Sequence, residues 1–473
     1  MTLKDWRYIV FWAVFSFIWI TFCADNVLGF IISVLMFVIL LWYGVFRKET
    51  ILQVILLLLF LIPEYPRDIL FLYDALDAKE IFYNTINTVK IGPLTLYYWA
   101  MISLPIVTIV KSGLKISYAS GVAVSILIGV IIYLFLVTLT SSQSFNLSTA
   151  ITNVKIYTIL LCTFLLLSNW KEQELKAVLN NFLIFLPVII GLRVILFITY
   201  DFTLGTPSWD YFTQPLITVI AFIYLLQNNN KTIIEKSLTY RILFYISLFS
   251  LSRALIAIVV ISFIVAMFLS KKRVLKMKVL IEVVPFITIL CFTVLVTNPN
   301  LYNFLLWKVS DLNVFESKKE ISGSGKVRQY EILNILDGTD SSDKTILIGF
   351  GLSGHFNFDK HKLPIQEALD SKSFSEVERL ENRFYFPHSF LAANLLRGGI
   401  LLTLIYVLVH LALAIHFYRR RDFYLSMLSI FLIYNSYVRV EYAILLSILI
   451  LLALFTHQGR SINIDMIRQQ PNE

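Results

Sequence analysis

The sequence predicts an all-α, polytopic membrane protein of about 12–14 spanning helices, with one large loop outside the membrane that carries short helices. Three observations predict it. Hydrophobic residues make up 58% of the 473 residues and charged residues only 15%, whereas a soluble domain carries about 25% charged residues. Apolar runs of 15 to 22 residues recur along most of the chain. One long polar stretch, residues 298–387, interrupts them in the C-terminal half.

The apolar runs are long enough to be membrane-spanning helices. A bilayer core about 30 Å thick requires about 20 apolar residues in a helix, and lipid offers no partner for an unpaired backbone group. The runs do not alternate apolar with polar residues, as the strands of a membrane barrel do. Fourteen candidate spans are expected, at approximately 8–24, 27–46, 51–63, 93–110, 119–139, 150–168, 181–199, 215–227, 241–251, 254–270, 279–297, 389–417, 422–437 and 441–456.

The spans divide the chain into four parts and the basic residues orient them. Residues 1–297 form an array of about eleven spans, 298–387 the large loop, 388–456 about three more spans, and 457–473 a tail. With the N-terminus inside, the inner loops hold 21 Lys and Arg residues and the short outer loops 6, Lys155 among them. Because cytoplasmic loops are enriched in Lys and Arg, both termini are expected in the cytoplasm and the large loop outside.

The large loop is expected to fold into a cap. Loops this long are usually functional or disordered, but residues 298–387 contain amphipathic stretches at Val327–Leu336 and Ile365–Leu380, which favour short helices. A second outer segment, Glu64–Gly92, is expected to be re-entrant or interfacial, because its apolar parts are broken by charge.

Composition also excludes some classes of function. The net charge of +9 is explained by basic inner loops. No basic soluble face is present for nucleic acid, so no nucleic-acid partner is expected. The three cysteines, Cys23, Cys162 and Cys291, lie within apolar runs and are expected to be small hydrophobic residues, not disulfides or metal ligands.

Two arginines lie at or near membrane depth, where a cation is costly and usually faces a polar cavity or a partner. Arg253 stands between two apolar runs in Leu251-Ser252-Arg253-Ala254. The alternative is that its side chain extends to the outer headgroups. Arg193 lies in the middle of a run, and its alternative is a structural pair with a buried carboxylate.

Further candidate residues belong to the large loop. Lys326 and Arg328 lie in Gly325-Lys326-Val327-Arg328, and the alternative for them is a solvated surface. Arg383 and His388 lie in Arg383-Phe384-Tyr385-Phe386-Pro387-His388. Because proline suits the start of a helix, His388 is expected at the mouth of the next span, where a lone histidine is more often structural than catalytic.

A metal site is not expected. His355, Asp359 and His361 are close in sequence, but their spacing matches no familiar site and the neighbouring Lys360 and Lys362 oppose cation binding. The chain also lacks a nucleotide-binding glycine motif, so no cofactor is expected.

The order of these weak signals resembles that of the O-antigen polymerase and O-antigen ligase family of bacterial membrane glycosyltransferases. In that family a Ser-Arg pair at an outer helix end is followed by a loop arginine, a glycine cluster, a His-Asn pair and a glycine-rich helical turn. The matching positions here are Ser252-Arg253, Arg328, Ile348–Gly354, His388-Ser389 and Leu396–Ile400. Ser389 departs from the family's asparagine. The resemblance covers about 241–417, and the N-terminal half matches only as an array of helices.

The resemblance implies an enzyme that works at the outer face of the cytoplasmic, or inner, membrane without a metal. Its donor and acceptor would be undecaprenyl-pyrophosphate-linked oligosaccharides, and it would polymerise their repeat units into O-antigen, capsule or exopolysaccharide. Partners of such enzymes include a chain-length regulator and a flippase. The ligases of the family instead transfer the glycan to lipid A-core.

The residue types suit that chemistry. Arginine is always protonated and presents a planar fork of donors to phosphate oxygens, so Arg253 and Arg328 are the expected catalytic cations. Lys326, Arg383 and Arg193 are expected to assist in binding pyrophosphate. A histidine can accept the proton of a sugar hydroxyl, which is the role expected of His388.

Two alternatives remain. The ligase reaction uses the same residues, although the missing His-Asn form favours a polymerase. A lipid-linked oligosaccharide flippase or another transporter would show two similar halves. This sequence shows no such repeat, and one large outer loop favours an enzyme.

Overall fold

The computed structural model describes part of the chain. The described residues are 31, 35, 90–91, 94–112, 116–167, 170–177, 179, 324–337, 343–362, 376–387, 389–435 and 443–455. The chain forms two compact units, the first of which comprises Met1–Phe22, Ile55–Glu64 and Leu179–Lys319. The second comprises Cys23–Val54, Tyr65–Val178 and Glu320–Glu473. Every described residue except Leu179 belongs to the second unit, and the description below concerns that unit.

A short hairpin precedes the first described helix. Strand β1 (Lys90–Ile91) pairs antiparallel with β2 (Leu94–Thr95), so that Lys90 lies opposite Thr95. Helix α7 (Leu96–Ser112) begins directly after β2. The span expected from residue 93 therefore starts three residues later, because the first residues of that run pair as a strand instead.

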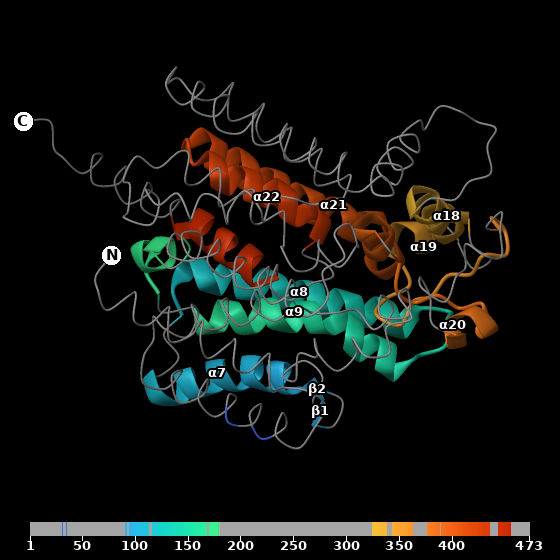
Figure 1. Cartoon of the computed structure of the whole chain (residues 1–473), viewed down its shortest axis with the longest axis horizontal. Coiled ribbons are helices and arrows are strands. Elements are labelled where there is room, and N and C mark those ends of the chain that lie inside the picture. The colour runs from blue at the N-terminus through green and yellow to red at the C-terminus, as the bar shows by residue number, and fades with distance from the viewer. Residues whose placement is uncertain are drawn as a thin grey trace, which may run out of the picture. The chain divides into compact units, whose positions relative to one another are not determined.

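Helices α8 (Tyr118–Thr140) and α9 (Leu147–Leu166) form a hairpin and lie side by side in Figure 1. Each begins at a capping side chain, which accepts a hydrogen bond from a backbone N–H that the helix itself leaves unpaired. Ser117 Oγ accepts from Ser120 N at 3.2 Å. Asn146 Oδ1 accepts from Thr149 N at 3.1 Å. The caps place both helix starts within three residues of the expected spans.

Helix α7 packs against α9 through a cation and an aromatic ring. Lys155 Nζ lies 5.0 Å from the centre of the Tyr98 ring. Lys155 belongs to the third turn of α9, so its assignment to an outer loop was wrong. Its side chain is only partly buried, and the ring provides a favourable face for the ammonium group.

Helices α21 (Phe390–Arg419) and α22 (Phe423–Asn435) form a second hairpin. The chain reverses at Arg421, which has a φ of 64°. Here Asp422 N donates to Phe417 O at 3.0 Å, closing the end of α21 with a bond that spans five residues. Ser426 Oγ donates to Ala414 O at 2.8 Å and joins the two helices. Residues Ala443–Phe455 form a further apolar helix.

Three short helices, α18 (Ser324–Asp337), α19 (Asp343–Ile348) and α20 (Glu376–Glu381), gather at one end of α21 (Figure 1). The helix expected at Val327–Leu336 is confirmed as part of α18. Most of the stretch expected at Ile365–Leu380 lies outside the described residues, and only its end is helical, in α20. A core of Ile335, Phe350, Phe356, Phe358, Phe384, Ala392, Leu395 and Leu396 joins this region to α21.

Three described helices are long and apolar enough to cross a membrane: Ser120–Thr140, Leu147–Leu166 and Phe390–Arg419. Phe423–Ile433 and Ala443–Phe455 are shorter apolar helices. The expected mainly helical, membrane-associated character is confirmed for the part of the chain that is described. The expected spans at 8–24, 27–46, 51–63, 181–199, 215–227, 241–251, 254–270 and 279–297 lie outside it, apart from the isolated helical positions Ile31 and Leu35.

Candidate functional site at one end of the helices

The two ends of the helical hairpins differ in the groups that meet there. At one end, Gln143 of the α8–α9 connection pairs with His355 of the loop that precedes α21. At the other end, Arg420 Nη1 lies 3.9 Å from Glu172 Oε1, and Lys176 Nζ lies 2.8 Å from the same oxygen. The α8–α9 connection and His355 of the large loop therefore lie together at one end of these helices, and Glu172, Lys176 and Arg420 lie together at the other.

Residues Gly349–Gly354, here called the glycine loop, are all buried at the first of these ends. Phe350 N donates to Leu396 O and Gly351 N to Arg397 O, both at 2.8 Å. These carbonyls need outside partners because Gly399, with φ 64° and ψ −161°, breaks the helical path of α21. The glycine loop thus supplies the backbone donors that the interrupted helix lacks.

Glycine is required where the two segments meet. Gly349 and Gly351 have φ values of 79° and 83°, which side chains rarely allow. A Cβ atom on Gly349 would lie 2.5 Å from Gly399 N, and one on Gly351 would lie 2.5 Å from Thr138 Cα. The glycine cluster and the glycine-rich turn, about fifty residues apart in sequence, are therefore two halves of one contact.

Two hydroxyl groups of α8 hold the glycine loop. Tyr133 Oη lies 3.1 Å from both Ile348 O and Gly398 O, so one phenol bridges the loop and the helix break. Thr138 Oγ1 accepts a hydrogen bond from Leu352 N at 2.8 Å. The last two turns of α8 are thereby joined to the loop.

Two amide side chains hold the far end of the glycine loop. Asn153 Nδ2 of α9 donates to Leu352 O at 2.7 Å. Gln143 makes a two-bond pairing with the backbone of His355, in which its Nε2 donates to His355 O at 2.9 Å and its Oε1 accepts from His355 N at 2.8 Å. An amide side chain has the same donor and acceptor as a peptide group, so it can pair with a peptide as a neighbouring strand would.

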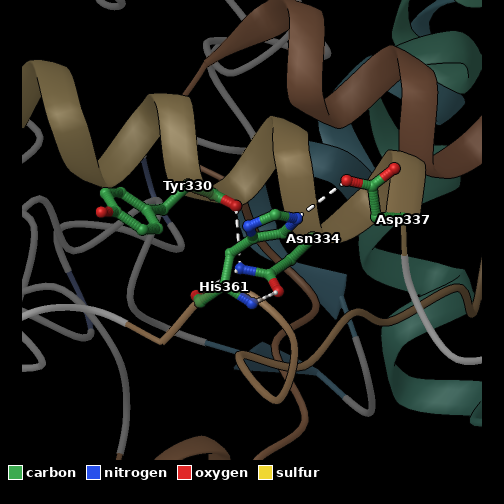
Figure 2. A network of polar contacts seen from close by, with 4 residues as sticks. All are labelled: Tyr330, Asn334, Asp337 and His361. Carbon is green, nitrogen blue, oxygen red and sulfur yellow. Dashed lines mark hydrogen bonds and ion pairs between the residues drawn. The ribbon is translucent and has the colours of Figure 1, made fainter.

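A second two-bond pairing holds His361, as Figure 2 shows. Asn334 Nδ2 donates to His361 O at 2.8 Å, and Asn334 Oδ1 accepts from His361 N at 3.0 Å. The same amide also donates to Tyr330 O at 2.9 Å within α18. Gln143 therefore fixes one end of the segment 355–361 against the α8–α9 connection, and Asn334 fixes the other end against α18.

The three residues with metal-ligand chemistry have separate partners. His361 Nε2 lies 2.8 Å from Asp337 Oδ2 (Figure 2), and Asp359 Oδ1 accepts from Asn382 Nδ2 at 2.8 Å. The His355 ring lies 5.6 Å from the Tyr385 ring. Among the described residues, no three His, Cys, Asp or Glu side chains come together as metal ligands.

Helix α18 carries Arg328 to the region of the glycine loop. Ile335 of α18 belongs to the same buried core as Phe350, and Val327 packs against that core. Arg328 is half-buried, whereas Glu331, one turn further along α18, is fully buried. Lys326 lies in the first turn of the same helix. The Arg328 side chain is therefore partly buried, and its role in binding stays a prediction.

Of the remaining expected site residues, one is exposed and three lie outside the described residues. Arg383 is exposed, although its neighbour Phe384 is buried and forms a strand-like bridge with Phe356. His388, Arg253 and Arg193 lie outside the described residues. Whether Arg253, Arg328 and His388 meet around one cavity therefore stays a prediction.

The start of α21 differs from the expectation that His388 opens the helix. The helix begins at Phe390, and Ser389 is its capping residue, with Oγ accepting from Ala392 N at 3.2 Å. Pro387 therefore lies before the cap rather than in the first turn. Asparagine and serine are about equally good helix caps, so either residue type could begin the helix at this position.

Sequence reasoning missed two buried polar residues on α21. Arg397 is 7% exposed and Asn394 is 2% exposed. The Arg397 guanidinium forms a hydrogen bond with the Tyr157 hydroxyl of α9. Arg397 was noted only as a member of the glycine-rich turn. The signal that would have found it is an arginine inside an apolar run, which costs about 2.5–3.5 kcal/mol on insertion scales.

No family model matches the sequence, and no curated protein or solved structure matches it. The described part is a helical protein with helices able to cross a membrane, in which a buried glycine loop completes a broken helix. Its particular activity is the subject of the following proposal.

Proposed function

We propose that this protein polymerises undecaprenyl-pyrophosphate-linked oligosaccharide repeat units into a surface polysaccharide. In this proposal it is a multi-pass protein of the bacterial cytoplasmic membrane with both termini inside. The end of the helices that bears the glycine loop faces outward. The enzyme belongs, in this proposal, to the O-antigen polymerase and ligase type of glycosyltransferase.

The observation that carries the proposal is the contact between the two glycine motifs. The resemblance to the family rests on motifs in a fixed order, which alone does not bring them together. In the structure, Gly349 meets the break at Gly399 and Gly351 N donates to Arg397 O, and α18, which carries Arg328, packs on the adjoining core. A chain that kept these motifs for unrelated reasons would have no cause to bring them to one end of one helix.

The proposed reaction is a displacement at the anomeric carbon of the donor. A hydroxyl oxygen of the acceptor repeat unit bonds to that carbon as its bond to the pyrophosphate oxygen breaks, and undecaprenyl pyrophosphate leaves. Arg328 and Arg253 stabilise the negative charge on the leaving group. His388, which directly precedes the cap of α21, accepts the proton of the attacking hydroxyl. The energy for the transfer is already present in the glycosyl pyrophosphate linkage, so the proposed reaction needs no nucleotide as an energy source.

Deletion of the gene, followed by gel analysis of surface polysaccharide, tests the function. Loss of a polymerase should leave single repeat units on the final acceptor, whereas loss of a ligase should leave none. Unchanged polysaccharide would refute both. Complementation with Arg328→Ala should restore no polymer and with Arg328→Lys little, because an ammonium group lacks the planar fork. Lys360→Ala, which removes an exposed cation from the same region, is the matched control and should restore polymer fully.

A further inference from the structure

We infer that Asn394 and Arg397 form an anion-binding position for a phosphate group carried on a polyprenyl lipid. This inference deepens the proposed function and rests on it, because it names residues that would hold the substrate's pyrophosphate. Neither residue is among the binding or catalytic residues expected from the sequence, where Arg397 appears only as a member of the glycine-rich turn.

Asn394 supplies the first observation. Its side chain is 2% exposed, and its Nδ2 has no hydrogen-bond partner in the part of the chain that the structure describes. A buried donor without a partner is unfavourable, and a leucine of similar size would avoid the cost. An asparagine is useful here when a ligand acceptor atom takes the hydrogen bond.

Arg397 supplies the second observation. It lies three residues after Asn394, on the same face of α21, and is 7% exposed. Its guanidinium donates a hydrogen bond to the Tyr157 hydroxyl of α9, which helps to orient the planar fork. A donor without a partner beside a cation selects an acceptor with negative charge, and phosphate oxygens fit this description better than a cation or an apolar group.

The backbone near this position is also suited to an anion. A broken helix exposes carbonyl oxygens, which would repel phosphate. Here Phe350 N and Gly351 N take the carbonyls of Leu396 and Arg397, and the glycine loop thereby covers them.

The depth of the position fits a lipid-borne phosphate. Arg397 lies eight residues beyond the cap at Ser389, which is about 12 Å along a helix. Asn394 lies between them, so a ligand that enters from the capped end meets its amide before the guanidinium. A pyrophosphate fixed to a polyprenyl chain is held near this level by the membrane, whereas a free phosphate is not.

Binding of farnesyl pyrophosphate to the detergent-purified full chain tests the inference, with farnesol and inorganic pyrophosphate as comparison probes. Wild type should bind farnesyl pyrophosphate more tightly than either. Asn394→Leu should weaken that binding about tenfold, the value of one hydrogen bond to a charged group, while the melting temperature stays equal or rises. Arg397→Gln should weaken it further, and the exposed-site control Lys360→Ala should have no effect.

Two results would overturn the inference. One is unchanged affinity of Asn394→Leu for farnesyl pyrophosphate. The other is equal affinity of wild type for farnesol, which would mean that only the apolar chain binds. Failure of the proposed function can be distinguished from failure of this inference. If gene deletion leaves surface polysaccharide intact but Asn394→Leu still loses farnesyl pyrophosphate binding, the anion position stands and the polymerase proposal fails.

Discussion

Gly351 lies so close to the backbone of Thr138 that no side chain fits at this position. Its φ of 83° is strained for any other residue, and a Cβ atom there would lie 2.5 Å from both Thr138 N and Thr138 Cα. The neighbour is backbone and cannot rotate away. The contact cannot be inferred from the local sequence, because a glycine in a loop has many possible causes.

Replacing Gly351 with alanine should destabilise the protein by at least about 2 kcal/mol, the combined effect of a strained φ and overpacking. The melting temperature of the purified protein measures it. Gly129→Ala is the matched control, because nothing lies within 4 Å of the added Cβ on α8. That variant should gain about 0.5–1 kcal/mol from helix propensity. Equal melting temperatures for the two variants would contradict the packing described here.

Ser389 is the second residue whose function the structure specifies. Its Oγ caps α21, so Ser389→Asn should keep both stability and polymer formation close to wild type, whereas Ser389→Ala should lose about 1 kcal/mol of stability. Thermal unfolding together with complementation of a deletion strain measures both effects. A Ser389→Asn variant that folds well but makes no polymer would show that the hydroxyl does more than cap the helix.

At the scale of elements, sequence patterns located helices well and their interruptions poorly. The apolar runs place α8, α9, α21 and α22 within a few residues of their observed limits. The break at Gly399 was not expected, because nothing in a Gly-Gly pair says whether a helix continues through it. The β1–β2 hairpin was also missed, since two residue pairs are too short to produce a periodic pattern.

The turn between α21 and α22 gives a prediction about pH. Burial raises the pKa of the Asp422 carboxyl, although Lys176 and Arg420 oppose the shift. A carboxyl whose folded-state pKa is raised binds more protons when folded, so stability falls as the pH rises from its ordinary pKa through the raised value. Asp422→Asn should therefore melt at an equal or higher temperature at pH 7, and the difference should shrink as the pH falls towards the ordinary pKa of aspartate. A lower melting temperature at pH 7 would show that the ion contacts outweigh burial.

At the scale of the whole molecule, residues at the two ends of the helices test which end faces the outside of the membrane. Lys360 and Lys171 are both exposed and lie at opposite ends of the described helices. In intact spheroplasts, an impermeant thiol reagent should label Lys360→Cys and leave Lys171→Cys unlabelled until the membrane is opened. The buried Cys162 should contribute no background. The reverse labelling pattern would place the glycine loop in the cytoplasm and remove the basis for the enzyme proposal.

The candidate site could be predicted from the sequence as a set of motifs but not as an arrangement. Composition and charge predicted the class of protein, because the bilayer imposes strict limits on length and polarity. The contact between the glycine loop and α21 joins segments about fifty residues apart through backbone hydrogen bonds. Because nearly all residue types carry the same backbone donor and acceptor, these bonds cannot be recognised from the residue types in the sequence. Arg397 was missed because it is followed by Gly398 and Gly399, and the segment was therefore interpreted as a glycine-rich turn.

The pairing of the glycine loop with α21 also bears on the order in which the chain assembles. As α21 enters the lipid during synthesis, the carbonyls of Leu396 and Arg397 cannot be satisfied by their own helix. Their partners, Phe350 N and Gly351 N, belong to a segment that is synthesised earlier. That segment in turn needs Thr138 and Asn153, which are synthesised earlier still. Synthesis from the N-terminus therefore delivers each of these segments after the earlier segment with which it pairs, and a circularly permuted chain that began at α21 would insert a helix with open carbonyls.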